Sequence, residues 1–211
     1  MLVARGQEEL GKVVRELKEE LPHAEVHALA FDVGDKIATH RIAGAAAALV
    51  GPIDVLVHAA STLGPLPMPL LLDTACEDLA KVLEVNLVGP FRLTKALLGS
   101  MSVRKRGVVV FVSSDAAVSA YPQWAAYGVS KAALDQLARS FAAEVPSVRS
   151  FAFDPGEMDT KMHADAMPDA DRSTLQKPSV VAERLVALLE RSEKVPNGAR
   201  IIASDFAKEF L

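Results

Sequence analysis

The run VVVFV, at residues 108–112, is apolar on both faces of any strand it forms. A strand with one face in water would alternate apolar and polar residues, so this run is expected of a central strand in a parallel sheet. Strand-like and helix-like segments alternate along the rest of the chain, with turn residues between them. The sequence therefore predicts an α/β fold of three layers, in which helices cover both faces of a parallel sheet.

The hydrophobic pattern and the turn signals place the individual elements. Asp35 is a candidate N-cap for a helix that Gly51-Pro52 stops, and Thr74 with Glu77 has the spacing of a capping box. We expect strands at residues 2–4, 27–31, 53–58, 108–112, 148–153 and 200–203, and further helices at residues 7–21, 74–101, 124–144 and 179–193.

Length and composition exclude several classes of protein. A chain of 211 residues is long enough for one good-sized core, so we expect residues 1–211 to form a single domain. The net charge of −4 gives no basic surface for nucleic acid. No apolar stretch is long enough to span a bilayer, and no signal-like segment opens the chain, so we expect a cytoplasmic protein without membrane contact. Cys76, the single cysteine, stands apart from any histidine spacing that suggests a metal.

Polar or turn-forming residues follow four of the expected strands. In open α/β sheets, ligands bind in the crevice beyond the carboxyl ends of the strands, so these residues should face one cleft. They are Asp32 and Val33, His58 to Ser61, Ser113 and Ser114, and Asp154 to Gly156.

Tyr127 and Lys131 are four residues apart on an expected helix, which places both side chains on one face. A nearby ammonium would stabilise the tyrosine phenolate and bring its pKa from about 10 toward neutrality. Ser114 could then polarise a substrate carbonyl by a hydrogen bond. Taken alone, a tyrosine and a lysine at this spacing are more often an exposed helix pair.

Together with the motifs around it, this pair resembles the catalytic residues of the short-chain dehydrogenase/reductase family. The resemblance runs from the first residues to about Ala203. It implies a Rossmann-like, doubly wound parallel sheet and an NAD(P)-dependent oxidoreductase that moves a hydride between the nicotinamide and a carbonyl or alcohol. The matching positions are Ser114, Tyr127, Ser130 and Lys131 in the family's serine and YxxSK pattern, Asn86 in VNLVGPF, and Pro155, Gly156 and Thr160 in its PGxxxT.

The resemblance also implies a role for each residue. Tyr127 would be the general acid/base, Ser114 the carbonyl polariser, Lys131 the ribose holder and tyrosine activator, and Asn86 the anchor of a water relay. Pro90 supports the last role independently, because a proline supplies no N–H to the carbonyl four residues earlier, which belongs to Asn86. The alternative is that Asn86 merely tolerates a kink.

The chain departs from the family at the cofactor pyrophosphate. The family's first strand leads into a loop with glycines at relative positions one, five and seven, but no two of the twelve glycines here are separated by a single residue. Residues 2–4 resemble the family's second strand, so we expect an N-terminally truncated sheet and weak cofactor binding. Another possibility is that Met1 is a late methionine of a longer reading frame.

Arg5 follows the strand that would lie beside the adenosine ribose. An arginine there suits a 2′-phosphate and favours NADP over NAD, although it could equally be a solvated residue beside a frayed end. Asp154 replaces a small neutral residue, and its carboxylate could alter the nicotinamide environment or point away. The resemblance implies cofactor contacts from Arg5, Asp32, Val33, His58, Ala60, Tyr127, Lys131, Pro155, Gly156 and Thr160, those of His58 and Ala60 largely through the backbone.

We expect a small, partly apolar substrate. We also expect a homodimer or homotetramer, because helices 74–101 and 124–144 correspond to those through which family members pair. The rival function is a cofactor-poor pseudoenzyme, or an interaction or signalling protein that keeps the fold. Residues expected to border the substrate pocket are Tyr121, Trp124, Met158, Met162, His163 and Met167, although several could instead only pack the loop.

Loss of the first strand should leave a gap in the middle of the sheet. Because buried, unpaired backbone groups cost about 1–3 kcal/mol each, we expect residues 2–4 to pair directly with residues 53–58. The alternative is a strand lent by a partner subunit.

Overall fold

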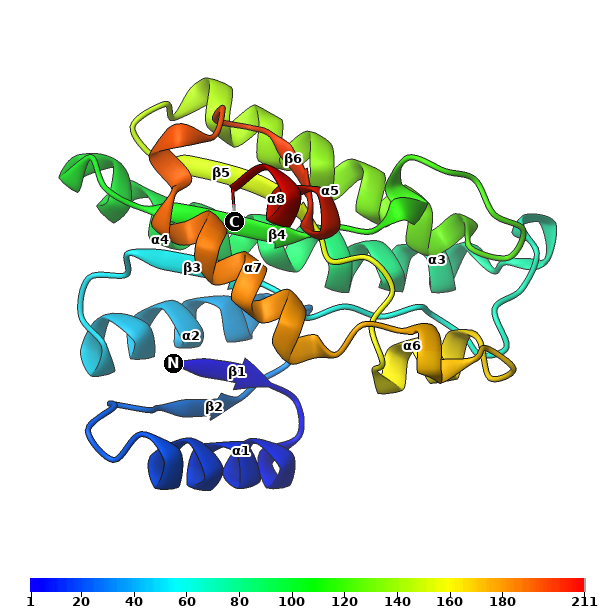
Figure 1. The fold of residues 1–211 in the computed structure, drawn as a ribbon, viewed down its shortest axis with the longest axis horizontal. Helices are drawn as coiled ribbons and strands as arrows, with labels where there is room; N and C mark the ends of the chain where they lie inside the picture. The colour runs from blue at the N-terminus through cyan, green and yellow to red at the C-terminus, as the bar shows by residue number, and fades with distance from the viewer. Residues whose placement is uncertain (211) are drawn as a thin grey trace.

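The computed structural model describes residues 1–210, with side chains as far as Phe206. All six expected strands are present and all run parallel, so the α/β class is confirmed (Figure 1). Two helices, α6 and α8, were not expected. The strands are β1 (Leu2–Ala4), β2 (Ala28–Ala30), β3 (Val55–His58), β4 (Val108–Val112), β5 (Arg149–Asp154) and β6 (Arg200–Ile202), and the helices are α1 (Gln7–Glu20), α2 (Lys36–Leu49), α3 (Cys76–Leu83), α4 (Gly89–Arg104), α5 (Ala125–Glu144), α6 (Lys161–Ala166), α7 (Pro178–Glu190) and α8 (Ala203–Phe210).

Strand β4 is buried on both faces, as its sequence predicts. Val109 and Phe111 pack against α4 and α5 on one face, whereas Val110 packs against α7 and α8 on the other. Phe151 and Phe153 of β5 join Val110 in the second cluster. The two clusters are the cores of the three-layer arrangement.

The sheet is split into two parts, and the expected pairing of residues 2–4 with 53–58 is wrong. Strand β1 pairs with β2, and β3 pairs with β4 in a separate sheet of order β3-β4-β5-β6. A groove of about 780 Å³ lies between β1 and β3 and is lined by residues of both strands and of α2. Within residues 1–210, no other strand fills this groove.

Solvent exposure explains why the two edges stay apart. The N–H of Val108 bonds to the carbonyl of Asp54, so the alternation of a parallel ladder turns the backbone groups of Val55 and Val57 toward the groove. These residues are 43% and 37% exposed. Water can therefore satisfy the groups that the sequence argument treated as buried, and the full desolvation cost does not arise.

Helix α2 connects the two sheets from one side. Its buried residue Ile42 belongs to a cluster with Leu93, against which Val3 and Phe31 of the first sheet region and Leu56 of the second are packed. The Asp35 carboxylate accepts a 2.8 Å bond from the N–H of Ile37, so the predicted cap of this helix is confirmed.

The helix expected at 74–101 is two helices, α3 and α4, joined by a π-helical turn at Glu84–Val88. The capping box is wrong: the Thr74 hydroxyl instead donates to the carbonyl of Leu70, at the end of a short 3-10 turn. Pro90 lies in the first turn of α4, where its missing N–H is tolerated.

Among the described helices, none has both the length and the apolar character needed to cross a membrane.

Candidate active site

A cavity of about 580 Å³ opens at the carboxyl ends of β4 and β5. Three of the four predicted segments line it, those that follow β3, β4 and β5. The fourth does not, since Asp32 and Val33 follow β2 on the other side of the groove. The predicted site residues in the cavity wall are Ser114, Tyr127, Lys131, Pro155, Gly156 and Thr160.

Tyr127 and Lys131 form a buried pair on α5. They are 8% and 3% exposed, and the ammonium of Lys131 lies 5.4 Å from the centre of the Tyr127 ring. The same ammonium donates a 2.7 Å bond to the carbonyl of Val112 at the end of β4. An exposed helix pair is therefore the wrong interpretation, because both side chains belong to the cavity wall.

Burial shifts the pKa of each group in the direction that favours its neutral form. It raises the pKa of Tyr127 to about 12, and the neighbouring Ser114 side chain opposes this rise only in part. It lowers the pKa of Lys131 to about 8, although the carboxylates of Asp135 and Asp154 oppose this shift. Burial therefore favours the neutral phenol of Tyr127. The lowering of its pKa, which requires the ammonium to act together with a positively charged nicotinamide, stays a prediction.

The hydroxyl of Ser114 lies between a donor and an acceptor of its own loop. It donates a 2.9 Å bond to the Asp115 carboxylate and accepts a 3.2 Å bond from the N–H of Ala116. Asp115 also accepts a 2.9 Å bond from the Tyr121 hydroxyl. Sequence reasoning missed Asp115, although its place directly after the two serines was a usable signal.

Asn86, which matches a motif of the family, also has a structural role. Its side chain is almost completely buried, donates to the carbonyl of Thr62 and the hydroxyl of Ser130, each at 2.9 Å, and accepts from the N–H of Thr62 at 2.8 Å. Ser130 in turn donates a 2.6 Å bond to the carbonyl of Tyr127. This chain of bonds joins the loop after β3 to the catalytic helix. The water relay through the Asn86 carbonyl stays a prediction.

The residues expected at the border of the substrate pocket are all in the cavity wall, and Trp124 meets the Tyr127 ring edge-on at 5.8 Å. They are Tyr121, Trp124, Met158, Met162, His163 and Met167.

His58 points its side chain into the protein interior. Its Nε2 is 2.8 Å from the hydroxyl of Thr94, and its ring stacks on Phe111 with 5.0 Å between centres. Burial lowers the pKa of His58 to about 3, so the ring is neutral. Any cofactor contact at this position must therefore use the backbone, as the sequence argument assumed.

The remaining predicted cofactor residues lie along the groove or on the first sheet. Ala60 and Val33 line the groove, Asp32 accepts a 2.8 Å bond from the N–H of Gly34, and Arg5 is exposed at the end of β1. Both interpretations of Arg5, ribose-phosphate ligand and solvated residue, are consistent with this exposure.

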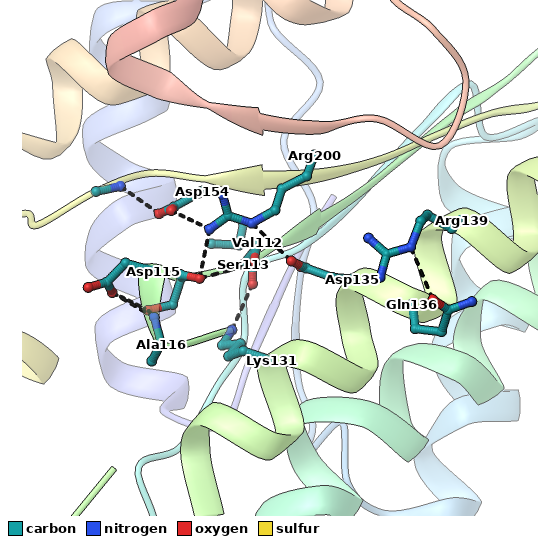
Figure 2. Close-up of polar contacts among 12 residues, drawn as sticks. Val112, Ser113, Asp115, Ala116, Lys131, Asp135, Gln136, Arg139, Asp154 and Arg200 are labelled. Carbon is teal, nitrogen blue, oxygen red and sulfur yellow. Dashed lines mark hydrogen bonds and ion pairs between the residues drawn. The ribbon is translucent and has the colours of Figure 1, made fainter. Parts of the chain in front are cut away.

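Arg200 and Asp135 are further residues that sequence reasoning missed. Arg200 forms an ion pair with Asp154, which also accepts a 3.0 Å bond from the N–H of Gly156, and a second ion pair with Asp135. Figure 2 shows the guanidinium between the two carboxylates. Asp154 therefore turns toward Arg200, which settles the direction of its side chain.

The residues present fit one end of a dinucleotide. The buried ammonium of Lys131, the phenol of Tyr127 and the turn at Gly156, whose φ is +71°, meet in one cavity. The described chain offers no glycine-rich loop for a pyrophosphate. Among the described residues, no group of three or more histidine, cysteine, aspartate or glutamate side chains is placed to hold a metal ion.

Comparisons with known proteins point to the same family as the residues of the site. The family model for short chain dehydrogenase matches residues 1–171. A short chain dehydrogenase of Pseudocercospora fijiensis is 37% identical over 199 residues, which cover 91% of this chain and 60% of that protein. Sepiapterin reductase of Xenopus laevis is 30% identical over 199 residues, covering 92% of this chain and 72% of the reductase.

A solved structure shares the fold. The alcohol dehydrogenase of the archaeon Thermococcus sibiricus, in complex with 5-hydroxy-NADP, is 27% identical and superposes with a TM-score of 0.82 over 95% of this chain and 83% of that one. The family model, these relatives and the residues of the cavity lead to one conclusion: the chain belongs to the short-chain dehydrogenase/reductase family.

Proposed function

We propose that this chain is an oxidoreductase that transfers a hydride between NADP and a carbonyl or alcohol substrate. The observation that carries the proposal is the buried Tyr127 and Lys131 pair, which lines one cavity together with Ser114. Burying a phenol beside an ammonium costs free energy that a purely structural position would not require. Perturbed titratable groups in a cavity are typical of acid/base sites.

Tyr127 acts as the proton donor when a carbonyl is reduced. Its raised pKa, about 12, keeps the phenol protonated at the start of the reaction. The Ser114 hydroxyl, next to it, turns from Asp115 to hydrogen-bond the carbonyl oxygen and polarises it. Lys131 titrates near pH 8 and can return a proton to the phenol. Asn86 holds the loop and helix that carry these groups in register.

The nicotinamide, when bound, supplies or accepts the hydride. Lys131, Tyr127, Pro155, Gly156 and Thr160 would hold its end of the cofactor. Arg5 supports a 2′-phosphate, hence NADP, and the alcohol dehydrogenase of Thermococcus sibiricus was solved with 5-hydroxy-NADP.

The substrate is a small, partly apolar molecule. The cavity of about 580 Å³ has a size typical of small-molecule sites, and its wall contains Trp124 and three methionines.

A homo-oligomer, a cytoplasmic location and a single domain stay proposals. Exposed apolar side chains on both helices, Phe91 at 41% and Val103 at 86% on α4 and Val129 at 53% on α5, support pairing through these helices. The expected result in sedimentation is a dimer or tetramer at micromolar concentration, and a monomer would contradict it.

A spectrophotometric assay tests the proposed function. NADPH oxidation is followed with a panel of aldehydes and ketones, over cofactor concentrations well above those that saturate most family members. We expect turnover with NADPH in the wild type, and a lower preference for NADPH over NADH in Arg5→Ala. The chain spans 60% of the length of its Pseudocercospora fijiensis relative. If no cofactor binds at any concentration, the rival function, an interaction protein that keeps the fold, takes its place.

A further inference from the structure

Arg200 reaches from the start of β6 to three oxygens behind the cavity. Its Nη2 donates to the Asp154 carboxylate at 2.6 Å and to the carbonyl of Ser114 at 2.9 Å, and its Nε donates to the Asp135 carboxylate at 3.0 Å. Three separate parts of the fold, the loop after β4, helix α5 and the end of β5, thus meet at one guanidinium (Figure 2).

The strand register brings Arg200 to this place. Arg200 pairs with Ala152 on β5, and Asp154 lies two residues further on the same face of that strand. Ala152 packs in the cluster with α5, so the same face looks toward the helix that carries Asp135. The ion pairs therefore follow from the parallel pairing of β5 and β6.

The cluster is buried, so its charges depend on one another. The side chains of Arg200, Asp135 and Asp154 are 16%, 4% and 5% exposed. Burial raises the pKa of Asp135, and the Ser113 hydroxyl and Arg200 oppose that rise. Removing the guanidinium would leave two buried carboxylates without their shared partner, an arrangement far less stable than the intact cluster.

Lys131 lies next to this cluster. Asp135 follows it by one helical turn on α5, and both Asp135 and Asp154 raise the pKa of Lys131 against the effect of burial. With Arg200, these two carboxylates and one ammonium sum to zero net charge. Charged groups that act on the cluster or on Tyr127 from the surrounding elements are Arg139 of α5 and Asp115 of the loop after β4.

We propose that Arg200 is a positioning residue for this active site: it holds the main chain of Ser114 and balances the carboxylates of Asp135 and Asp154 behind Lys131. Its effect on turnover rests on the proposed function, whereas its effect on Lys131 does not. Arg200 touches neither substrate nor cofactor in this account and acts through Ser114 and Lys131.

The first test replaces the guanidinium by an uncharged side chain of similar length, Arg200→Met. With Ser114 less firmly held, kcat should fall about ten- to a hundredfold with a smaller change in KM. With one excess negative charge left in the cluster, the pKa of Lys131 should rise by about one unit. Lys131 is titrated by NMR of lysine labelled at the ε-carbon, with its signal assigned by Lys131→Arg, so this measurement needs no substrate.

Two further variants separate charge from hydrogen bonding. Adding Asp154→Asn to Arg200→Met restores the charge balance and should return the Lys131 pKa toward its original value, while kcat stays low. Arg200→Lys keeps the charge but not the fork of donors, so it should leave the Lys131 pKa nearly unchanged and recover only part of kcat. Should Arg200→Met fail to fold, the double variant is compared with Asp154→Asn alone, and adding Arg200→Met should raise the Lys131 pKa.

Arg149→Met is the matched control for lost stability. Arg149 lies at the opposite end of β5 and donates to the carbonyls of Ser192 and Val195, away from the cavity. It should lower stability without moving the Lys131 pKa or the pH profile of kcat. An unchanged Lys131 pKa in Arg200→Met, or the same loss of kcat in both arginine variants, overturns the inference. A raised Lys131 pKa without turnover in the wild type supports the charge balance and refutes the proposed function instead.

Discussion

Replacing Asn86 by alanine removes a buried side chain that links two parts of the active site. This side chain makes three hydrogen bonds, two with the backbone of Thr62 and one with Ser130. The residue as a whole is 1% exposed. Asn86→Ala leaves the N–H and carbonyl of Thr62 without these partners. At about 1 kcal/mol for each bond, the free energy of unfolding should fall by about 3 kcal/mol.

Asn197→Ala is a matched comparison in the same chain. The Asn197 side chain also clasps backbone groups, accepting from the N–H of Ser150 and donating to the carbonyl of Val148, but it does so far from the cavity. With two bonds instead of three, it should cost about 2 kcal/mol. Only the Asn86 variant should also lower kcat, because only Asn86 connects to Tyr127 through Ser130.

Urea unfolding followed by tryptophan fluorescence measures both losses, since Trp124 is the single tryptophan. The midpoint should fall for both variants with an unchanged slope, and in thermal unfolding about 3 kcal/mol corresponds to a Tm lower by roughly 6–12 °C in a domain of this size. A loss below about 1 kcal/mol for Asn86→Ala, or equal effects of the two variants on kcat, would refute the reasoning.

Two more predictions concern His58 and the open edge of β3. The folded pKa of His58, about 3, lies below the unfolded value near 6.5, so the unfolded state takes up the proton first and stability should fall as the pH drops from about 6.5 toward 3. The contribution is fully present above pH 6.5, and His58→Gln should show a smaller acid loss in urea titrations at successive pH values; parallel curves would contradict this. In hydrogen exchange, the amides of Val55 and Val57 face the groove and should exchange faster than those of Leu56 and His58, which face β4. Equal protection along β3 would mean that another segment pairs with this edge.

The sequence carried the local part of the fold well. The run at 108–112, the turn residues between elements and the spacing of Tyr127 and Lys131 are each local patterns, and each element they predict is present. The end of α3 and the start of α4 were harder to predict from the sequence, because the π turn at Glu84–Val88 continues the same helical periodicity.

The long-range features were out of reach for physical reasons. Arg200 meets Asp135 and Asp154 across 65 and 46 residues, and only the register of β5 and β6 brings them together. Thr62 acts through its backbone, which any residue could supply. The closure of the sheet was predicted wrongly because the edge at Val55, which was expected to be buried, is open to water.

Deuterium transfer tests the central claim most directly. The wild-type chain is incubated with an accepted aldehyde and NADPH that carries deuterium at both C4 positions of the nicotinamide, and the alcohol is examined by mass spectrometry. We predict deuterium in the alcohol, a loss of at least about a hundredfold in rate for Tyr127→Phe with cofactor binding nearly intact, and retained transfer in Tyr121→Phe, the only other tyrosine. An alcohol without deuterium, or a Tyr127→Phe rate equal to that of the wild type, would contradict the account.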